Sequence, residues 1–344
     1  MKSKTIVAAI STRTGLTGLL RLTHRLLRPG RALILVYHRL RKDDDYRDLF
    51  SQDVLGPTVT LFEGQMRYLK ECYHVVALDR IIAFLKGEGA LPTNAVAITF
   101  DDGYLDTYTL AYPILQKYGL PATVFLTTGF VGTQGLLWSD RVAYCISQAR
   151  SQAVTLNGIR HSLYTATERR AAVKRVIDGL KQVTEERKLE LLEELQRACG
   201  VEVQERAYNL ALSWDEVREM ARNGITFGAH TVTHPILTRV PKEVAKWEIL
   251  ESKLTIERRL KRPVRLFAYP NGEPGDFDKG IQGILEDFGF DAAFTTIHGR
   301  NRFNTDRFAL RRLWIGPNDD LPIFKAKLAG LFDLLRPMKR FLGI

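Results

Sequence analysis

Three short, mainly apolar runs constrain the fold of this chain more than any other feature. They cover residues 32–38, 95–100 and 121–127, and short apolar runs without alternation are typical of strands that are buried on both faces of a parallel sheet. Helical patterns lie between them, at 62–70 and 108–118. Because strands that alternate with helices form parallel sheets, the sequence predicts a parallel α/β architecture.

Two adjacent carboxylates follow the second apolar run. The segment at 99–104 is T-F-D-D-G-Y, so the strand ends in Asp101 and Asp102, and Gly103 then allows a sharp turn. Adjacent strand residues point to opposite faces, so these two side chains can perform different tasks at one strand end. On its own, such a triplet is commonly only a turn.

Two histidines follow another apolar run. The segment at 230–234 is H-T-V-T-H, which places His230 and His234 four residues apart after the run at 225–228. One aspartate and two histidines suit a catalytic divalent metal that keeps an open position for water, and a second aspartate can act as the general base for that water. Two such histidines are often unrelated, but both motifs directly follow strands, which favours metal-assisted hydrolysis.

The two motifs, in this order and separation, resemble those of the polysaccharide deacetylases, also called carbohydrate esterase family 4, over about residues 32–316. The resemblance implies an α/β fold with a distorted parallel (β/α) barrel of the NodB-homology type, often with fewer than eight strands. It also implies that Asp101 is the catalytic base. Asp102, His230 and His234 are then the ligands of a divalent metal ion, for which we expect Zn²⁺.

Three further residues are expected to contact the substrate. By the same resemblance, the backbone N–H of Tyr104 stabilises the oxyanion that forms on the acetyl carbonyl. The segment F-A-Y-P-N-G at 267–272 stands where the family has its third motif, and we expect its Tyr269 and Asn271 to line the glycan groove. Trp138 has two interpretations, as a platform for a sugar ring or as an ordinary core residue.

The chain departs from the family's pattern at two positions. Ala268 stands where the family has an arginine that orients the base. Arg311 or Arg312, from another strand, is therefore the candidate for that role. The same pair follows Leu310 at the place where the family has its general-acid histidine, so the acid must also come from elsewhere.

Two histidines are candidates for the general acid. His38 stands at the end of the first strand, and His298 lies in a segment whose sequence looks flexible. Each histidine taken alone is better explained as a structural or solvent-exposed residue. We prefer His38, because barrel enzymes gather their chemistry at the carboxyl ends of the strands.

The alternation of strands and helices stops between about 140 and 212, which predicts a helical insertion. Residues 166–198 are rich in Glu, Lys, Arg and Leu, and the charged positions could form a lid or simply a solvated face. The predicted organisation is a basic amphipathic N-terminal segment at 1–31, a barrel at 32–316 that contains the insertion, and a basic amphipathic C-terminal helix at 317–344.

The chain is basic, with 50 Lys and Arg against 39 Asp and Glu and a net charge of +11. It carries no recognition-helix signature, zinc finger or aromatic–basic repeat, so we expect no nucleic-acid partner. Acidic glycans or an anionic membrane surface suit this charge better. At 16–28 and 324–340, apolar residues alternate with Lys and Arg, as in helices that lie on a membrane surface. The alternative is that both segments pack on the barrel.

The three cysteines at 72, 145 and 199 form neither a disulfide framework nor a metal pair, which is consistent with a reducing compartment. The apolar run at 6–10 is too short for a signal peptide. We therefore expect a cytoplasmic protein, and the hypothesis that its basic ends hold it at the inner membrane face is left beside the alternative that they pack on the barrel.

The expected function is metal-dependent removal of acetyl groups from N-acetylated sugars of a polysaccharide or lipid-linked glycan, in cell-surface glycan biosynthesis. One alternative is a catalytically weak relative that binds glycan without turnover, since the usual acid and arginine are absent from their places. Another is a basic membrane-surface scaffold. The sequence leaves open the sugar, its length, the choice between N- and O-linked acetyl groups, and the oligomeric state.

Overall fold

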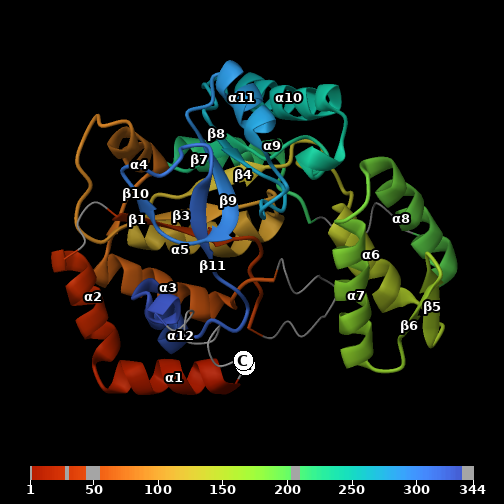
Figure 1. Cartoon of the computed structure of the whole chain (residues 1–344), viewed down its shortest axis with the longest axis horizontal. Coiled ribbons are helices and arrows are strands. Elements are labelled where there is room, and N and C mark those ends of the chain that lie inside the picture. The colour runs from red at the N-terminus through yellow and green to blue at the C-terminus, as the bar shows by residue number, and fades with distance from the viewer. Residues whose placement is uncertain (1, 28–30, 44–54, 203–209, 335–344) are drawn as a thin grey trace.

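The computed structural model describes residues 2–27, 31–43, 55–202 and 210–334 of the 344-residue chain. Within them, seven parallel strands close into a barrel (Figure 1). Going round the barrel, these are β1 (Arg31–Tyr37), β11 (Leu310–Trp314), β9 (Ala292–His298), β8 (Leu266–Ala268), β7 (Thr226–Ala229), β4 (Thr123–Leu126) and β3 (Ala95–Phe100). β3 pairs with β1 and closes the ring. The predicted distorted parallel barrel with fewer than eight strands is confirmed.

Two short strands extend this sheet beyond the ring. β2 (His74–Val75) pairs with β3, and β10 (Asn301–Arg302) pairs antiparallel with β1. The alternation of strands and helices predicted a parallel α/β architecture, so the antiparallel β10 is an addition. It is only two residues long, too short to be recognised in the sequence by an alternating pattern.

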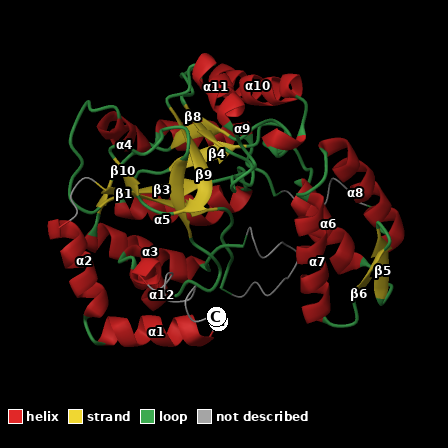
Figure 2. Cartoon of the chain, in the orientation of Figure 1, coloured by secondary structure: helices red, strands yellow, loops and turns green. Residues whose placement is uncertain are grey.

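Helices cover the outside of the barrel (Figure 2). They are α3 (Val59–Cys72), α4 (Leu78–Leu85), a π-helical turn (Thr107–Ala111) that leads into α5 (Tyr112–Tyr118), α9 (Trp214–Arg222), a 3₁₀ turn (Leu237–Arg239), α10 (Lys242–Leu260) and α11 (Lys279–Asp287). α3 buries Phe62, Met66 and Leu69, three residues at helical spacing that pack against the strands.

Between β4 and β7 the chain leaves the barrel and forms a lobe beside it (Figure 1). The lobe consists of α6 (Trp138–Gln148), β5 (Ala153–Leu156), β6 (Ile159–Ser162), α7 (Ala166–Leu180) and α8 (Glu185–Cys199), and it has its own apolar core. The β5–β6 hairpin was not predicted from the sequence. Its turn is Asn157-Gly158, with φ of 48° and 75°, a dipeptide that strongly favours two-residue hairpin turns.

The chain returns to the barrel through α9, which begins as the sequence suggested. Ser213 and Glu216 form a capping box, in which the Ser213 side chain accepts from the Glu216 N–H and the Glu216 carboxylate accepts from the Ser213 N–H.

The helices at the two ends of the described chain pack together. α1 (Lys2–Arg13) and α2 (Leu16–Leu27) lie beside α12 (Leu321–Leu328), and Ala8 packs against Ile323 and Ala326. Positions 28–30 and 335–344, which carry some of the basic residues of the predicted amphipathic segments, lie outside the described residues. Within the described part, no helix has both the length and the apolar character to cross a membrane.

Candidate metal and catalytic site

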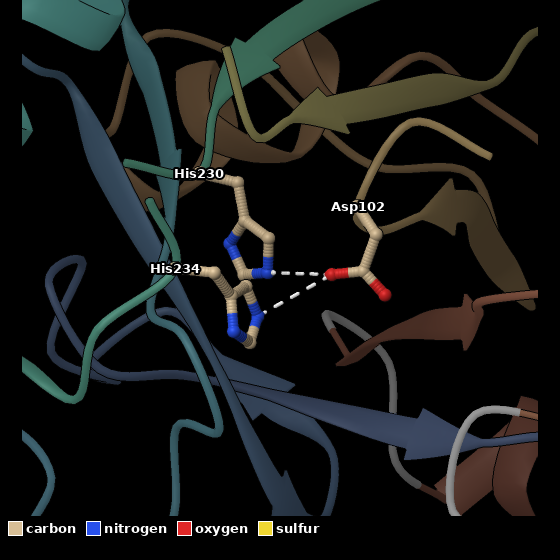
Figure 3. Close-up of side chains that lie close together, drawn as sticks. All are labelled: Asp102, His230 and His234. Atoms are coloured by element: carbon tan, nitrogen blue, oxygen red, sulfur yellow. Dashed lines mark ion pairs between the residues drawn. The ribbon is translucent and has the colours of Figure 1, made fainter. Parts of the chain in front are cut away.

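Asp102, His230 and His234 meet at the carboxyl ends of β3 and β7 (Figure 3). Oδ1 of Asp102 lies 3.4 Å from Nε2 of His230 and 3.3 Å from Nε2 of His234. Ligand atoms held about 2.1 Å from a tetrahedral metal ion are about 3.4 Å apart, so both separations fit such a site. The same Oδ1 is buried and has no hydrogen-bond partner among the described residues. A bound cation would satisfy it.

The backbone is strained at two of these three ligands. Asp102 has φ of 76° and His234 has φ of 62°, a left-handed conformation that costs about 1–3 kcal/mol and persists where the surroundings enforce it. The buried Glu248 of α10 provides such enforcement, since its carboxylate accepts from the N–H groups of Val232 (2.7 Å) and Thr233 (3.0 Å). The loop that carries both histidines is therefore held in place by a residue that is not itself a ligand.

The two imidazoles are oriented differently. Nδ1 of His230 lies 2.7 Å from the carbonyl oxygen of Ala268. Because a carbonyl only accepts, this nitrogen carries the proton and Nε2 presents its lone pair to the site. Nδ1 of His234 instead accepts from the indole N–H of Trp138 at 3.3 Å. A metal ion at Nε2 requires a proton on that Nδ1, so the Trp138 contact must open when the site is filled.

Asp102 and His230 favour each other's charged forms, whereas burial lowers the pKa of His234. Burial alone would raise the pKa of Asp102, but the nearby imidazoles of His230 and His234 hold that pKa well below its usual value. Burial alone would lower the pKa of His230, but the neighbouring Asp102 and Asp101 raise that pKa. The two carboxylates thus favour a positive charge between them, which a divalent ion supplies.

Asp101 forms a buried, bidentate ion pair with Arg312. Nη1 and Nη2 donate to its two oxygens at 2.7 Å and 2.6 Å, and the side chains are 1% and 0% exposed. Burial would raise the pKa of Asp101, but the charge of Arg312, supported by that of His230, holds that pKa below its usual value. The structure thus brings Arg312, and not the exposed Arg311, to Asp101.

Of the two candidate acids, only His38 lies at this site. Its Nε2 is 4.0 Å from Oδ2 of Asp101, and its buried Nδ1 has no hydrogen-bond partner among the described residues. His298 does not line the cavity, and its Nε2 pairs with Oδ1 of Asp333 at 2.5 Å. The preference for His38 over His298 therefore agrees with position, although its role as an acid stays a prediction.

The side chain of Tyr104 turns away from the cavity. It is fully buried, and its hydroxyl donates to Oδ2 of Asp140 at 2.8 Å. Tyr104 lies opposite Ala211 in an antiparallel bridge, whose hydrogen bonds involve the flanking residues. In such a bridge the N–H of the central residue points away from the partner segment. The predicted role of the Tyr104 N–H at the oxyanion is compatible with this position.

Asp140 gives a pH-dependent prediction. Burial raises its pKa to about 6, although Arg39 and the Tyr104 hydroxyl act in the opposite direction. The folded state therefore holds the proton more tightly than the unfolded state, whose pKa is near 3.8. The resulting stability is full below that value and is lost as the pH rises through 6. Relative to Asp140→Asn, we expect the wild type to lose about 2.4 kcal/mol of unfolding free energy between pH 4 and 7.5. Urea denaturation of both proteins across this range measures the difference, and a flat difference would contradict the assignment.

The ligands and Asp101 open into a cavity of about 400 Å³. Tyr269, Asn271, Trp138 and Trp314 line it, and their contact with a glycan stays a prediction. The Tyr269 hydroxyl is already engaged, since it donates to the carbonyl of Phe308 at 2.8 Å, so this residue offers the cavity its ring. One wall was missed by the sequence analysis and comes from α7, at positions 174, 177, 178 and 181.

Comparisons with a family model and with known sequences point to the same protein family. The family model for polysaccharide deacetylases matches residues 88–293. The Bacillus subtilis protein YxkH, named for the same family, is 21% identical over 291 residues, which cover 84% of this chain and 73% of that protein. The poly-β-1,6-N-acetyl-D-glucosamine N-deacetylase of Staphylococcus aureus is 36% identical over 119 residues, which cover 33% of this chain and 41% of that protein. The match thus spans less than half of the staphylococcal relative.

Solved structures share the fold. The Streptococcus pyogenes deacetylase PplD, in complex with acetate, superposes with a TM-score of 0.59 at 20% identity, over 87% of this chain and 99% of that one. IcaB from Ammonifex degensii superposes with a TM-score of 0.57 at 20% identity, over 87% and 97% of the two chains. Both comparisons support the barrel described above.

Proposed function

The chain belongs to the polysaccharide deacetylase family, and from this premise we propose that it is a zinc-dependent hydrolase that removes acetyl groups from N-acetylated sugars of a polysaccharide or lipid-linked glycan. The observation that carries the proposal is the buried Asp101–Arg312 pair beside the Asp102–His230–His234 set. A protein that only binds glycan needs no oriented base next to a metal site. The name of the staphylococcal relative supports N-acetylated sugars as the substrate class.

The chain's own groups divide the work of amide hydrolysis. A divalent metal held by Asp102, His230 and His234 would supply Lewis acidity, acidifying water and polarising the acetyl oxygen. Asp101, kept ionised by Arg312, accepts the proton of the water that attacks the acetyl carbon. The N–H of Tyr104 stabilises the oxyanion, and His38 protonates the sugar nitrogen as its bond to carbon breaks. Acetate and a sugar amine leave.

Zinc is the metal we propose for the site. Two imidazole nitrogens and one carboxylate oxygen form a donor set that suits Zn²⁺ with an open position for water. Harder ions such as Mg²⁺ prefer a shell of oxygen atoms. We expect chelation to remove acetate release and Zn²⁺ to restore it more fully than Mg²⁺ does.

The test is acetate release from a panel of N-acetylated oligosaccharides, by zinc-loaded and by metal-free protein. Turnover by the loaded protein alone supports the proposal. Glycan binding without turnover by the loaded protein would instead favour the weak glycan-binding relative. That alternative drew support from the missing family arginine, but Arg312 occupies the place beside Asp101.

We also propose peripheral contact of this protein with an anionic membrane, at the inner face of a cytoplasmic membrane. α1 and α2 direct large apolar side chains outward, with exposed fractions of 57% for Ile6, Ile10 and Leu19 and 47% for Leu22. Such exposed residues on a strongly basic protein suit the headgroup region of an anionic bilayer.

Flotation with anionic liposomes tests this contact. We expect the wild type to float at low salt, and a variant with Ile6→Ser, Ile10→Ser and Leu19→Ser to stay in solution. A matched triple substitution of exposed apolar residues elsewhere, Tyr164→Ser, Leu189→Ser and Trp247→Ser, should float like the wild type. Absence of wild-type binding at low salt would rule the contact out.

A further inference from the structure

α7 forms one wall of the catalytic cavity. Lys174, Ile177, Asp178 and Lys181 line it, and their spacing of three, four and seven residues places them on one face of the helix. Figure 1 shows α7 on the side of the lobe that faces the barrel. The insertion therefore contributes side chains to the cavity that holds the candidate metal ligands.

α7 is held firmly beside the metal site by its contacts within the lobe. The opposite face of α7 packs in the lobe core through Ala172, Val176 and Leu180. Arg169 of α7 donates to the carbonyl of Ile146 at 2.6 Å, which ties the helix to α6. α6 in turn begins at the residue whose indole contacts the second histidine of the metal set.

The charges on the cavity walls are mostly compensated. Asp101 is paired with Arg312. Asp178 is paired with Lys174 at 3.0 Å. Glu273, on the barrel side, accepts from the neutral Thr296 hydroxyl at 3.3 Å and has no ion pair among the described residues.

Lys181 is the lysine of this cavity lining that has no partner of opposite charge in the described part of the chain. Its ammonium has no ion pair or hydrogen bond among the described residues, and the side chain is half-buried. A cation that lines a cavity without a counter-ion attracts an anionic group of a ligand.

We infer that Lys181 forms a subsite for an anionic group of the glycan, next to the acetyl-bearing sugar. The inference rests on the proposed function and narrows its substrate class to acidic N-acetylated glycans. The shared chemistry is an oxyanion, which a carboxylate of an acidic sugar or a phosphate on the glycan supplies equally. Lys181 is then a specificity-determining residue and takes no part in bond breaking.

Three probes test the subsite and identify the anion. They are chitotetraose, which is neutral, a hyaluronan tetrasaccharide, which carries carboxylates, and N-acetylglucosamine 1-phosphate. Binding is measured by calorimetry on zinc-loaded protein that carries Asp101→Asn, so that no probe is consumed. The kcat/KM values are measured on the protein with Asp101 intact.

We expect Lys181→Glu to lower the preference for one anionic probe over chitotetraose by about tenfold, both in binding affinity and in kcat/KM. The change in kcat/KM should come from KM, with kcat unchanged. The wild-type preference should also fall as salt is raised. Arg175→Glu makes a similar charge change on the same helix, at an exposed residue outside the cavity lining, and should leave the preference unchanged.

The inference is overturned if the wild type prefers neither anionic probe, if Lys181→Glu keeps the preference, or if Arg175→Glu alters it equally. These outcomes are separate from the proposed function. Turnover of chitotetraose without an effect of Lys181 would leave a deacetylase and remove the subsite. Binding that depends on Lys181 without any turnover would keep the subsite and remove the deacetylase.

Discussion

Asp101→Asn is expected to lower acetate release by about 100- to 10,000-fold, the range over which a positioned general base contributes. The amide nearly matches the carboxylate in shape but cannot accept the proton of the attacking water. Asp101 is not one of the three candidate ligands, so the variant should bind metal as the wild type does. Acetate assays and metal analysis on the same samples measure both effects.

The matched control for this variant is Asp287→Asn, because Asp287 is exposed at the end of α11, away from the cavity. It should keep wild-type turnover. If Asp101→Asn keeps turnover within a few-fold while metal is bound, Asp101 is not the base. If the variant loses its metal, the loss of activity says nothing about a base. The assignment of one carboxylate as base and the other as metal ligand would then be wrong.

Arg312→Met is expected to lower the free energy of unfolding by about 3–5 kcal/mol, the cost of leaving one partner of a buried ion pair without the other. The Asp101 carboxylate would stay buried without its counter-charge, so its pKa should rise. The base would then lose its charge at a higher pH, and the acid limb of the pH–rate profile should move upward. Urea denaturation and kcat/KM against pH measure the two effects.

Arg311→Met is the matched control, since Arg311 precedes Arg312 on β11 and its side chain is exposed. A surface change of this kind usually alters stability by less than about 0.5 kcal/mol. An Arg312→Met variant that is less stable but keeps its pH profile would show that Arg312 supports the fold only. The profile is thus the readout that distinguishes orientation of the base from simple packing.

The main features of the site could be predicted because they are local. Asp101 and Asp102 directly follow one strand, and His230 follows another. The carboxyl ends of parallel strands meet at one end of a barrel, so residues far apart in sequence are brought together there. The choice between Arg311 and Arg312 could not be made from the local sequence. It depends on which side of β11 faces the interior, and β11 contains an irregular register between Leu310 and Arg312.

The insertion shows where prediction from sequence stopped. The helices of the lobe were expected from composition, but the face of α7 that lines the cavity could not be chosen. That face carries Lys174, Asp178 and Lys181 and looks like an ordinary solvated helix surface. Only the packing of the lobe against the barrel decides it. The β5–β6 hairpin was missed for another reason. The Asn157-Gly158 dipeptide at its turn is a hairpin signal in the sequence, but no hairpin was predicted from it.

Titration of metal-free protein with Zn²⁺, with acetate release measured at each addition, tests the central claim most directly. We predict that turnover rises in proportion to added zinc and saturates at one ion per chain. His230→Ala and His234→Ala should neither bind that ion tightly nor release acetate. Full turnover by metal-free protein, or by either histidine variant, would contradict a catalytic metal at Asp102, His230 and His234.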